Sequence, residues 1–367
     1  EIADRDWSSD VCSSDLERSG RLKNTKDDDT TIRERWEKRE LERLSPYACP
    51  AARSRGRKRE ETPCPLRTVF QRDRDRILHS RSFRRLKHKT QVLLLPESDH
   101  PRTRLTHTLE VSQIARTIAR ALDLNEDLTE AIALGHDLGH TPFGHMGERS
   151  LRDLVTELGL PGFHHASQSL RVVDCLEKNG AGLNLTWEVR MGIVQHSKGQ
   201  VDVHDGFHLE NPSTLEAWVV RVSDSIAYLN HDLDDAIGAG LLKPEDIPSE
   251  IVETLGGSHG ERIDALVRDV VRESREGTIS FSGPFLKQIE RLRHFLYVSV
   301  YSNEAIKKEE PKVAHVMRTL FRYAIEELGD SPQGAADRIS GMTDRYALQV
   351  FKQIAVPSSW PLGEGFL

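Results

Sequence analysis

The sequence of 367 residues is poor in cysteine and has no long apolar run. Its four cysteines, Cys12, Cys49, Cys64 and Cys175, are scattered and form no C-x-x-C pair. This excludes a disulfide-organised scaffold and favours a reducing compartment. The longest aliphatic run, Val92–Leu95, is far shorter than the ~20 residues of a membrane-spanning helix. Because no secretory signal pattern opens the chain either, we expect a cytoplasmic protein without a membrane partner.

Aromatic residues are also scarce, and basic residues are slightly outnumbered by acidic ones. Phe, Trp and Tyr make up 6% of the chain, and 51 Lys and Arg against 58 Asp and Glu leave a formal net charge of −7. This acidic balance argues against a protein that coats nucleic acid. Hydrophobic residues, at 37%, still suffice for a sizeable core.

The first residues do not resemble a folding sequence. Residues 8–16 nearly repeat a short motif without apolar periodicity and resemble a translated adapter fragment. Residues 1–20 are therefore treated as non-native and residues 1–30 as a disordered tail. Within residues 31–66 the sequence predicts a charged helix that ends before Pro46, followed by a short basic linker.

From residue 67 onward the apolar spacing is helical, so we expect an all-α fold. The clearest predicted helices cover residues 105–122, 128–138 and 215–233. Short strands are expected only at residues 90–95 and 278–281. We expect a core domain over residues 67–240 and a further helical region over residues 241–367.

Histidine is the residue type in excess. Seven of the 16 histidines fall between residues 100 and 165, where an even spread would place about three. They are His100, His107, His136, His140, His145, His164 and His165. Clustered histidines beside acidic residues indicate a metal or catalytic site.

Two of these histidines and two aspartates fit one cation site. His107 lies on the apolar stripe of its helix, where a histidine alone would more often be a core residue. His136-Asp137 ends the second predicted helix, with His140 one turn beyond. Asp224 lies in an apolar stretch of the third, so its burial would require a cation or an ion partner. Two imidazoles and two carboxylates suit Mg, Mn, Fe or Zn acting on phosphate esters.

Several longer motifs lie around these residues. They are Thr103–Val111, Gly135–Glu148, Ser223–Tyr228 and Gly341–Ala347, with Phe70–Ile77, Phe83–Leu86 and Lys89–Val92 upstream. Together they resemble the HD-domain dNTP triphosphohydrolases, in particular the bacterial dGTPase-like branch. The resemblance spans about residues 44–355 and implies an HD-domain helical bundle with additional C-terminal helices.

The resemblance implies a role for each matching residue. His107, His136, Asp137 and Asp224 would bind a divalent metal, Mg²⁺ or Mn²⁺. His145 and Glu148 match the catalytic pair that positions or activates the water at the α-phosphate. His140 matches a histidine on the leaving-group side, and His165 another active-site histidine.

Further matches concern the substrate. Arg104 would contact phosphate, whereas Gln91, Tyr228 and Asp232 match positions that read the deoxyribose and exclude a ribose hydroxyl. Ala166 stands where the family commonly has Asn, which puts the hydrogen bonding of its neighbour His165 in question. His196 lies where related hydrolases sometimes recruit an extra metal ligand.

The activity implied is hydrolysis of a dNTP, dGTP or several, to deoxynucleoside and inorganic triphosphate. The alternatives are an HD phosphohydrolase acting on other nucleotides or phosphate esters, and a non-catalytic regulator that binds nucleotide or single-stranded DNA. Nine basic residues between Arg67 and Lys89 are either a salt-bridged helix face or an anion-binding surface. An activating dNTP and a homo-oligomer are the remaining partners that the resemblance suggests.

Overall fold

The computed structural model describes residues 30–91, 102–197 and 212–357, and their regular secondary structure is helical, as expected. The helices are α1 (Ile32–Arg43), α2 (Val69–Leu78), α3 (Arg81–Arg85), α4 (Arg104–Ala121), α5 (Glu126–Gly135), α6 (Gly144–Glu157), α7 (His165–Arg171), α8 (Trp187–Gln195), α9 (Leu215–Gly238), α10 (Ser249–Leu255), α11 (His259–Glu273), α12 (Gly283–Leu296), α13 (Glu304–Lys307), α14 (Glu310–Glu326), α15 (Pro332–Ser340) and α16 (Asp344–Ala355). Residues 1–29 of the predicted tail lie outside the described residues. No helix in the described ranges is long and apolar enough to cross a membrane.

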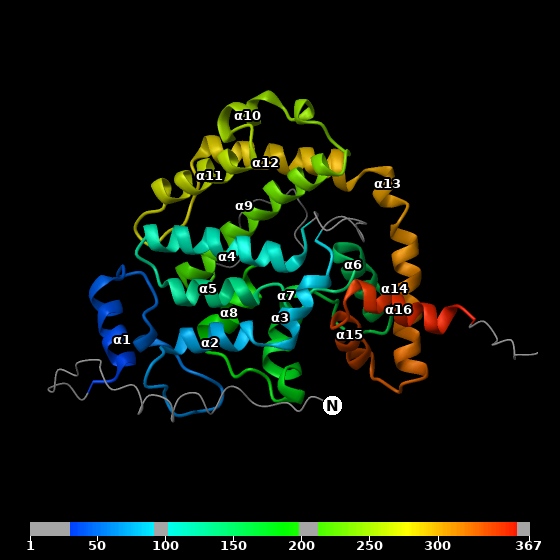
Figure 1. Ribbon diagram of the computed structural model, residues 1–367, viewed down its shortest axis with the longest axis horizontal. Coiled ribbons are helices and arrows are strands. Elements are labelled where there is room, and N and C mark those ends of the chain that lie inside the picture. Colours follow the sequence, from blue (N-terminus) through cyan, green and yellow to red (C-terminus); the bar gives the residue numbers. More distant parts are fainter. Residues whose placement is uncertain (1–29, 92–101, 198–211, 358–367) are drawn as a thin grey trace, which may run out of the picture.

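The centre of the molecule is a layer of antiparallel and crossing helices. Helices α2, α5 and α4 lie one above another in Figure 1, and α9 crosses behind α4. Side-chain caps start these helices where the sequence changes: Thr68 caps α2, Thr103 caps α4 and Asn125 caps α5. The crossing brings the first turn of α4, the end of α5 and the middle of α9 together.

The second predicted helix is shorter than expected. α5 ends at Gly135, three residues before the predicted end at Leu138. The ring of His136 turns back onto the carbonyl of Ala133, 2.6 Å from Nδ1, and the chain leaves the helix in a turn. His136 and Asp137 therefore lie at a helix end, where their side chains can face a shared site.

Apolar side chains form two separate clusters. The larger one, the first cluster, joins α2–α5 and α8 to α9–α12 and includes Ile132, Val219 and Leu292. The smaller one, the second cluster, joins α6 to α14–α16 and includes Leu151 and Leu320. In Figure 1 the elements of the second cluster lie along one flank of the molecule. The predicted boundary near residue 240 stays a prediction, and the helices on both sides of it share the first cluster.

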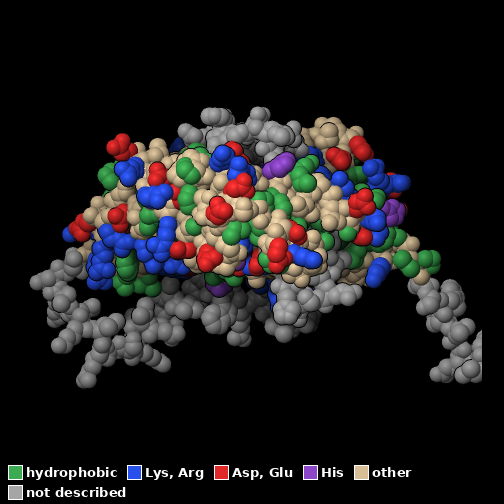
Figure 2. Space-filling model, turned by 90° about the horizontal axis from the view of Figure 1, so that it is seen from above, with side chains coloured by type: hydrophobic (Ala, Val, Ile, Leu, Met, Phe, Trp, Pro, Cys, Tyr) green, Lys and Arg blue, Asp and Glu red, His purple; other side chains and the backbone are tan. Residues whose placement is uncertain are grey.

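Part of the basic stretch before residue 90 is neutralised. Four of its arginines face carboxylates of α2, α5 or the preceding loop: Arg67 with Asp75, Arg72 and Arg76 with Glu61, and Arg74 with Asp127. Charges of both signs are likewise interspersed over the face seen in Figure 2. These contacts favour the salt-bridged helix face over an anion-binding surface for these four arginines.

The predicted strand at residues 278–281 is wrong. This segment is irregular, and Thr278 donates its backbone N–H to the carbonyl of Arg275 in a turn. The Ser280 hydroxyl instead donates to the carbonyl of Glu273, and the Ser282 N–H donates to Asp269, both near the end of α11. The sequence pattern of the segment does not reveal these hydrogen bonds. Of the predicted strand at residues 90–95, only Thr90 and Gln91 lie within the described residues, and Thr90 forms an isolated antiparallel bridge with Thr103.

Candidate functional site

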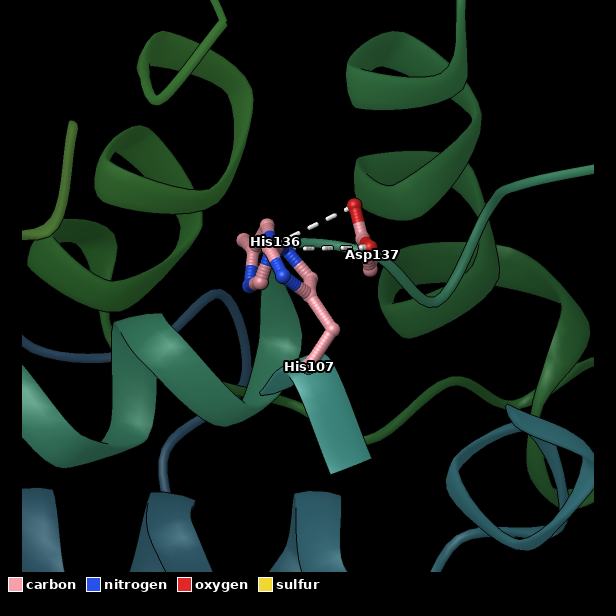
Figure 3. Close-up of side chains that lie close together, drawn as sticks. All are labelled: His107, His136 and Asp137. Carbon is pink, nitrogen blue, oxygen red and sulfur yellow. Dashed lines mark ion pairs between the residues drawn. The ribbon is translucent and has the colours of Figure 1, made fainter. Parts of the chain in front are cut away.

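Three helices bring the predicted ligands together. His107 comes from the first turn of α4, His136 and Asp137 from the end of α5, and all three are buried. One ligand atom from each lies within 4.8 Å of the other two, and Figure 3 shows the side chains converging. His136 Nε2 lies 3.3 Å and His107 Nε2 4.0 Å from oxygens of Asp137.

Asp224 completes the set from α9. Its Oδ1 lies 3.1 Å from His107 Nε2 and 3.9 Å from His136 Nε2. Burial acts to raise the pKa of Asp224, but the hydrogen bond from His107 and the neighbouring histidines hold that pKa below its ordinary value. His107 and His136 are therefore the partners that the sequence led us to expect for Asp224.

Local hydrogen bonds orient two imidazoles toward the site. His136 Nδ1 faces the carbonyl of Ala133 and His196 Nδ1 that of Ile193, each at 2.6 Å. A carbonyl only accepts, so Nδ1 of each ring carries a proton and Nε2 is the nitrogen turned toward the cluster. His136 Nε2 is buried and has no hydrogen-bond partner among the described residues.

The donor set fits a divalent cation. His136, His196 and Asp224 also bring ligand atoms within 4.8 Å of one another, so the predicted extra ligand borders the predicted four. Burial and the nearby His136 lower the pKa of His196 to about 3, so its ring is neutral as a metal ligand must be. The unpartnered Nε2 of His136 and the mixed nitrogen and carboxylate donors both match a bound metal ion.

Arg104 supplies a buried positive charge beside the ligands. Its side chain is 2% exposed, and Nη1 donates to Asp137 Oδ2 at 2.8 Å. Nε and Nη2 are buried and have no hydrogen-bond partner among the described residues. Since unpaired buried donors are costly, these N–H groups are suited to an anion bound next to the metal ligands.

A second histidine group surrounds Glu148 of α6. Glu148 accepts the backbone N–H of His165 at 2.9 Å, and His165 Nδ1 lies 3.1 Å from both carboxylate oxygens. His145 Nδ1 is farther, at 3.8 Å, and its side chain is 67% exposed. The structure thus brings the predicted catalytic residues together, with His165 rather than His145 in closest contact with Glu148. Glu148 thus holds both the backbone and the ring of His165, although residue 166 is Ala and not Asn.

The proton positions in this group follow from their partners. His165 Nε2 lies 3.3 Å from His196 Nε2. Although burial opposes it, Glu148 raises the pKa of His165, so its charged form is favoured. His140 stacks on His165 with ring centroids 4.0 Å apart, and burial and Arg104 lower its pKa. The group therefore combines one imidazole whose charged form is favoured with another whose neutral form is favoured.

The predicted deoxyribose readers lie on α9, one and two turns beyond Asp224, and at residue 91, where the described segment ends. Tyr228 accepts a hydrogen bond from Arg293 at 2.9 Å, and Asp232 accepts one from Tyr301. Burial raises the pKa of Asp232 to about 7. Gln91 is buried, and its Oε1 has no hydrogen-bond partner among the described residues.

Some residues at the site escaped the sequence reasoning. His231 Nδ1 lies 3.2 Å from His107 Nδ1, and its Nε2 lies 2.8 Å from Glu110 Oε2. Arg293 and Tyr301 reach the site from α12 and from the π-helical turn Tyr297–Tyr301. His231 had a signal, because it lies on the same polar face of α9 as Asp224, whereas nothing near Tyr301 in the sequence marks it.

Comparisons with known proteins agree with this geometry. The HD domain family matches residues 104–229, the segment that holds all four candidate metal ligands. A deoxyguanosinetriphosphate triphosphohydrolase-like protein of Caldanaerobacter subterraneus subsp. tengcongensis is 52% identical over 343 residues, 90% of this chain and 97% of the relative. Proteins with the same name from Desulfatibacillum aliphaticivorans and Clostridium tetani are 53% and 44% identical, each over 351 residues, and cover 89% and 90% of this chain and 99% and 98% of the relatives.

Proposed function

The chain belongs to the family of deoxyguanosinetriphosphate triphosphohydrolase-like proteins with an HD domain, and on this premise we propose that it hydrolyses a dNTP to deoxynucleoside and inorganic triphosphate. In this reaction a water oxygen bonds to the α-phosphorus while the bond from phosphorus to the 5′ oxygen breaks. The water gives up a proton and the leaving 5′ oxygen takes one.

The α-phosphate would lie between Arg104 and the ligand cluster. Arg104 Nε and Nη2, buried without partners, would donate to phosphate oxygens and stabilise the charge of the transition state. His107, His136, Asp137 and Asp224 would hold Mg²⁺ or Mn²⁺. When bound, this ion would supply Lewis-acid activation of the phosphate and of water.

The histidines around Glu148 would handle the protons. We assign His165, whose pKa is raised by Glu148, as the donor of the proton that the leaving 5′ oxygen takes. Glu148 and His145 would orient the attacking water at the exposed edge of the group. His140, neutral and with a buried unpartnered Nδ1, offers an acceptor beside them and so would not itself be the acid.

Discrimination against ribose would come from α9. Tyr228 is fixed by Arg293 and Asp232 by Tyr301, so the ring and the carboxyl have little freedom to make room for a 2′-hydroxyl. Gln91 would add a hydrogen bond to the sugar.

The observation that carries the proposal is Arg104, whose free buried donors lie next to the four candidate ligands. The test is to incubate the purified chain, without residues 1–20, with each dNTP alone and mixed in Mg²⁺ or Mn²⁺, and to separate the products by anion exchange. Deoxynucleoside with intact tripolyphosphate supports the proposal, and dependence on mixtures would identify an activating dNTP.

The Asp137→Ala variant, purified in parallel, is the control for contaminating phosphatases. Monophosphate with pyrophosphate would assign the chain to another class of phosphohydrolase. Tight nucleotide binding without turnover in every mixture would favour the regulator.

A further inference from the structure

The motif at Gly341–Ala347 has no place in the site described above, yet the structure connects it to the catalytic residues. Asp344, the first residue of α16, is buried and accepts a hydrogen bond from the backbone N–H of Phe143 at 3.0 Å. Its other oxygen accepts the N–H of Thr90 at 3.0 Å and also the Thr90 hydroxyl. One carboxylate thus joins two segments, one of them the loop between His140 and His145.

Lys89 makes a second connection to the same loop. Its ammonium group is 2% exposed and donates to the carbonyl of His140 and, at 2.7 Å, to that of Ser340 at the end of α15. Because lysine is rarely fully buried, such a position indicates a specific requirement for its donors. Lys89 and Asp344 together hold the loop at two points.

The loop they hold has an unfavourable backbone conformation. Phe143 has φ 63° and Gly144 has φ 54°, two consecutive left-handed residues immediately before His145. A non-glycine residue in this region costs roughly 1–3 kcal/mol and persists where its surroundings impose it. The Phe143 N–H bound by Asp344 belongs to that strained residue, so the carboxylate acts where the loop would otherwise relax.

We propose that Lys89 and Asp344 are positioning residues that hold the loop from His140 to His145 in register with Glu148. The side-chain hydrogen bonds of Lys89 and Asp344 go to residues other than the candidate metal ligands. Both residues act on the backbone of the loop that carries His140 and His145. The inference rests on the proposed function for its kinetic consequence, whereas its structural consequence can be measured without turnover.

The test compares Asp344→Asn with Asp269→Asn, a buried aspartate that lies away from the loop. Asp269 accepts a backbone N–H and a hydroxyl from Ser282, at 2.8 and 2.9 Å, and also pairs with Arg272. It lies on α11, which packs in the first cluster. Each Asp344 oxygen accepts a backbone N–H, so an asparagine there, with N–H₂ in place of one oxygen, loses one of these two bonds. At Asp269 only one oxygen accepts a backbone N–H, so an asparagine can keep that bond and turn its N–H₂ to the Ser282 hydroxyl.

We expect Asp344→Asn to lower kcat about 10²-fold, the scale of a misplacement near 1 Å. Its Mn²⁺ affinity, measured by calorimetry, should stay within about twofold of the wild type by the same reasoning. Asp269→Asn should leave kcat unchanged. The imidazole NMR resonances of His140 and His145 should move in Asp344→Asn only.

Equal effects of the two variants on kcat and on these resonances would overturn the proposal, as would a parallel loss of Mn²⁺ affinity. If Asp344→Asn does not fold, Lys89→Met, which leaves the carboxylate in place, carries the same test. If the wild type turns over no dNTP, the proposed function fails. The resonances of His140 and His145 then decide the positioning role alone.

Discussion

The two halves of the candidate site differ in what supports them. His107, His136, Asp137 and Asp224 project from α4, α5 and α9, whose apolar faces belong to the first cluster. Glu148 and its neighbour His145 lie on α6, which packs with α14–α16 in the second cluster. The metal-ligand half is thus built by helices of one bundle, whereas the catalytic half depends on residues far along the chain. Binding and chemistry should therefore be separable by mutation.

The largest effect is expected from a variant that disrupts the metal-ligand half. Asp137→Ala deletes a carboxylate that contacts Arg104, His136 and His140, and the buried Arg104 loses the hydrogen bond to that carboxylate. Metal binding and turnover should both be abolished, as followed by calorimetry with Mn²⁺ and by product analysis. Retention of Mn²⁺ affinity would show that the ligand set is assigned wrongly.

The next largest effect is expected from a variant that alters only the catalytic half. His145→Ala removes an exposed ring at the edge of the Glu148 group and should cut the rate by roughly 10²–10⁴. Mn²⁺ affinity should be unchanged, since His145 contacts no candidate ligand directly. If the metal is lost as well, the separation of the two halves does not hold.

A matched pair of cavity variants sharpens the comparison. Leu320→Ala on α14 and Leu292→Ala on α12 each empty a buried leucine site, at a cost of about 2–5 kcal/mol in unfolding free energy. Only Leu320 lies in the second cluster, so it alone should lower kcat in protein that is still folded. The measurement is kcat well below each variant's melting temperature, and equal kcat values would contradict it.

The smallest effect concerns stability and pH. Burial lowers the pKa of Lys89 to about 7, with Arg104 and Arg85 acting in the same direction and Asp344 and Asp137 opposing. The unfolded chain then binds more protons between pH 7 and about 10.5, so stability should rise with pH over this window. Relative to Lys89→Met, the wild type should gain roughly 2 kcal/mol between pH 7 and pH 9 in urea unfolding. A flat difference would contradict the shift.

The helical architecture and the four candidate ligands could be predicted because their signals are local. Apolar periodicity marks α4 and α9, and His136-Asp137 stands out beside a helix end at Gly135. The roles of individual histidines could not be read in the same way. That Glu148 contacts His165 more closely than His145 depends on how α6 and α7 pack, whereas spacing along α6 points only to His145.

Long-range support left no local signal. Phe143 and Asp344 are 201 positions apart, and Lys89 and Ser340 are 251 apart. A buried lysine or aspartate has the same sequence appearance as an exposed one, so only tertiary packing distinguishes them. The expected strand at residues 278–281 failed for the same reason, because its polar groups serve the end of α11.

The ring of His196 has a consequence for the heat of cation binding. Its Nδ1 donates to a main-chain oxygen, and burial lowers its pKa to about 3, so the ring carries a single proton that points away from the cluster. A cation arriving at the opposite nitrogen displaces no proton from this ring, so His196 does not contribute to proton release into the buffer. Calorimetric enthalpies measured in phosphate-free buffers of different ionisation enthalpy should therefore carry no buffer-dependent component from this imidazole.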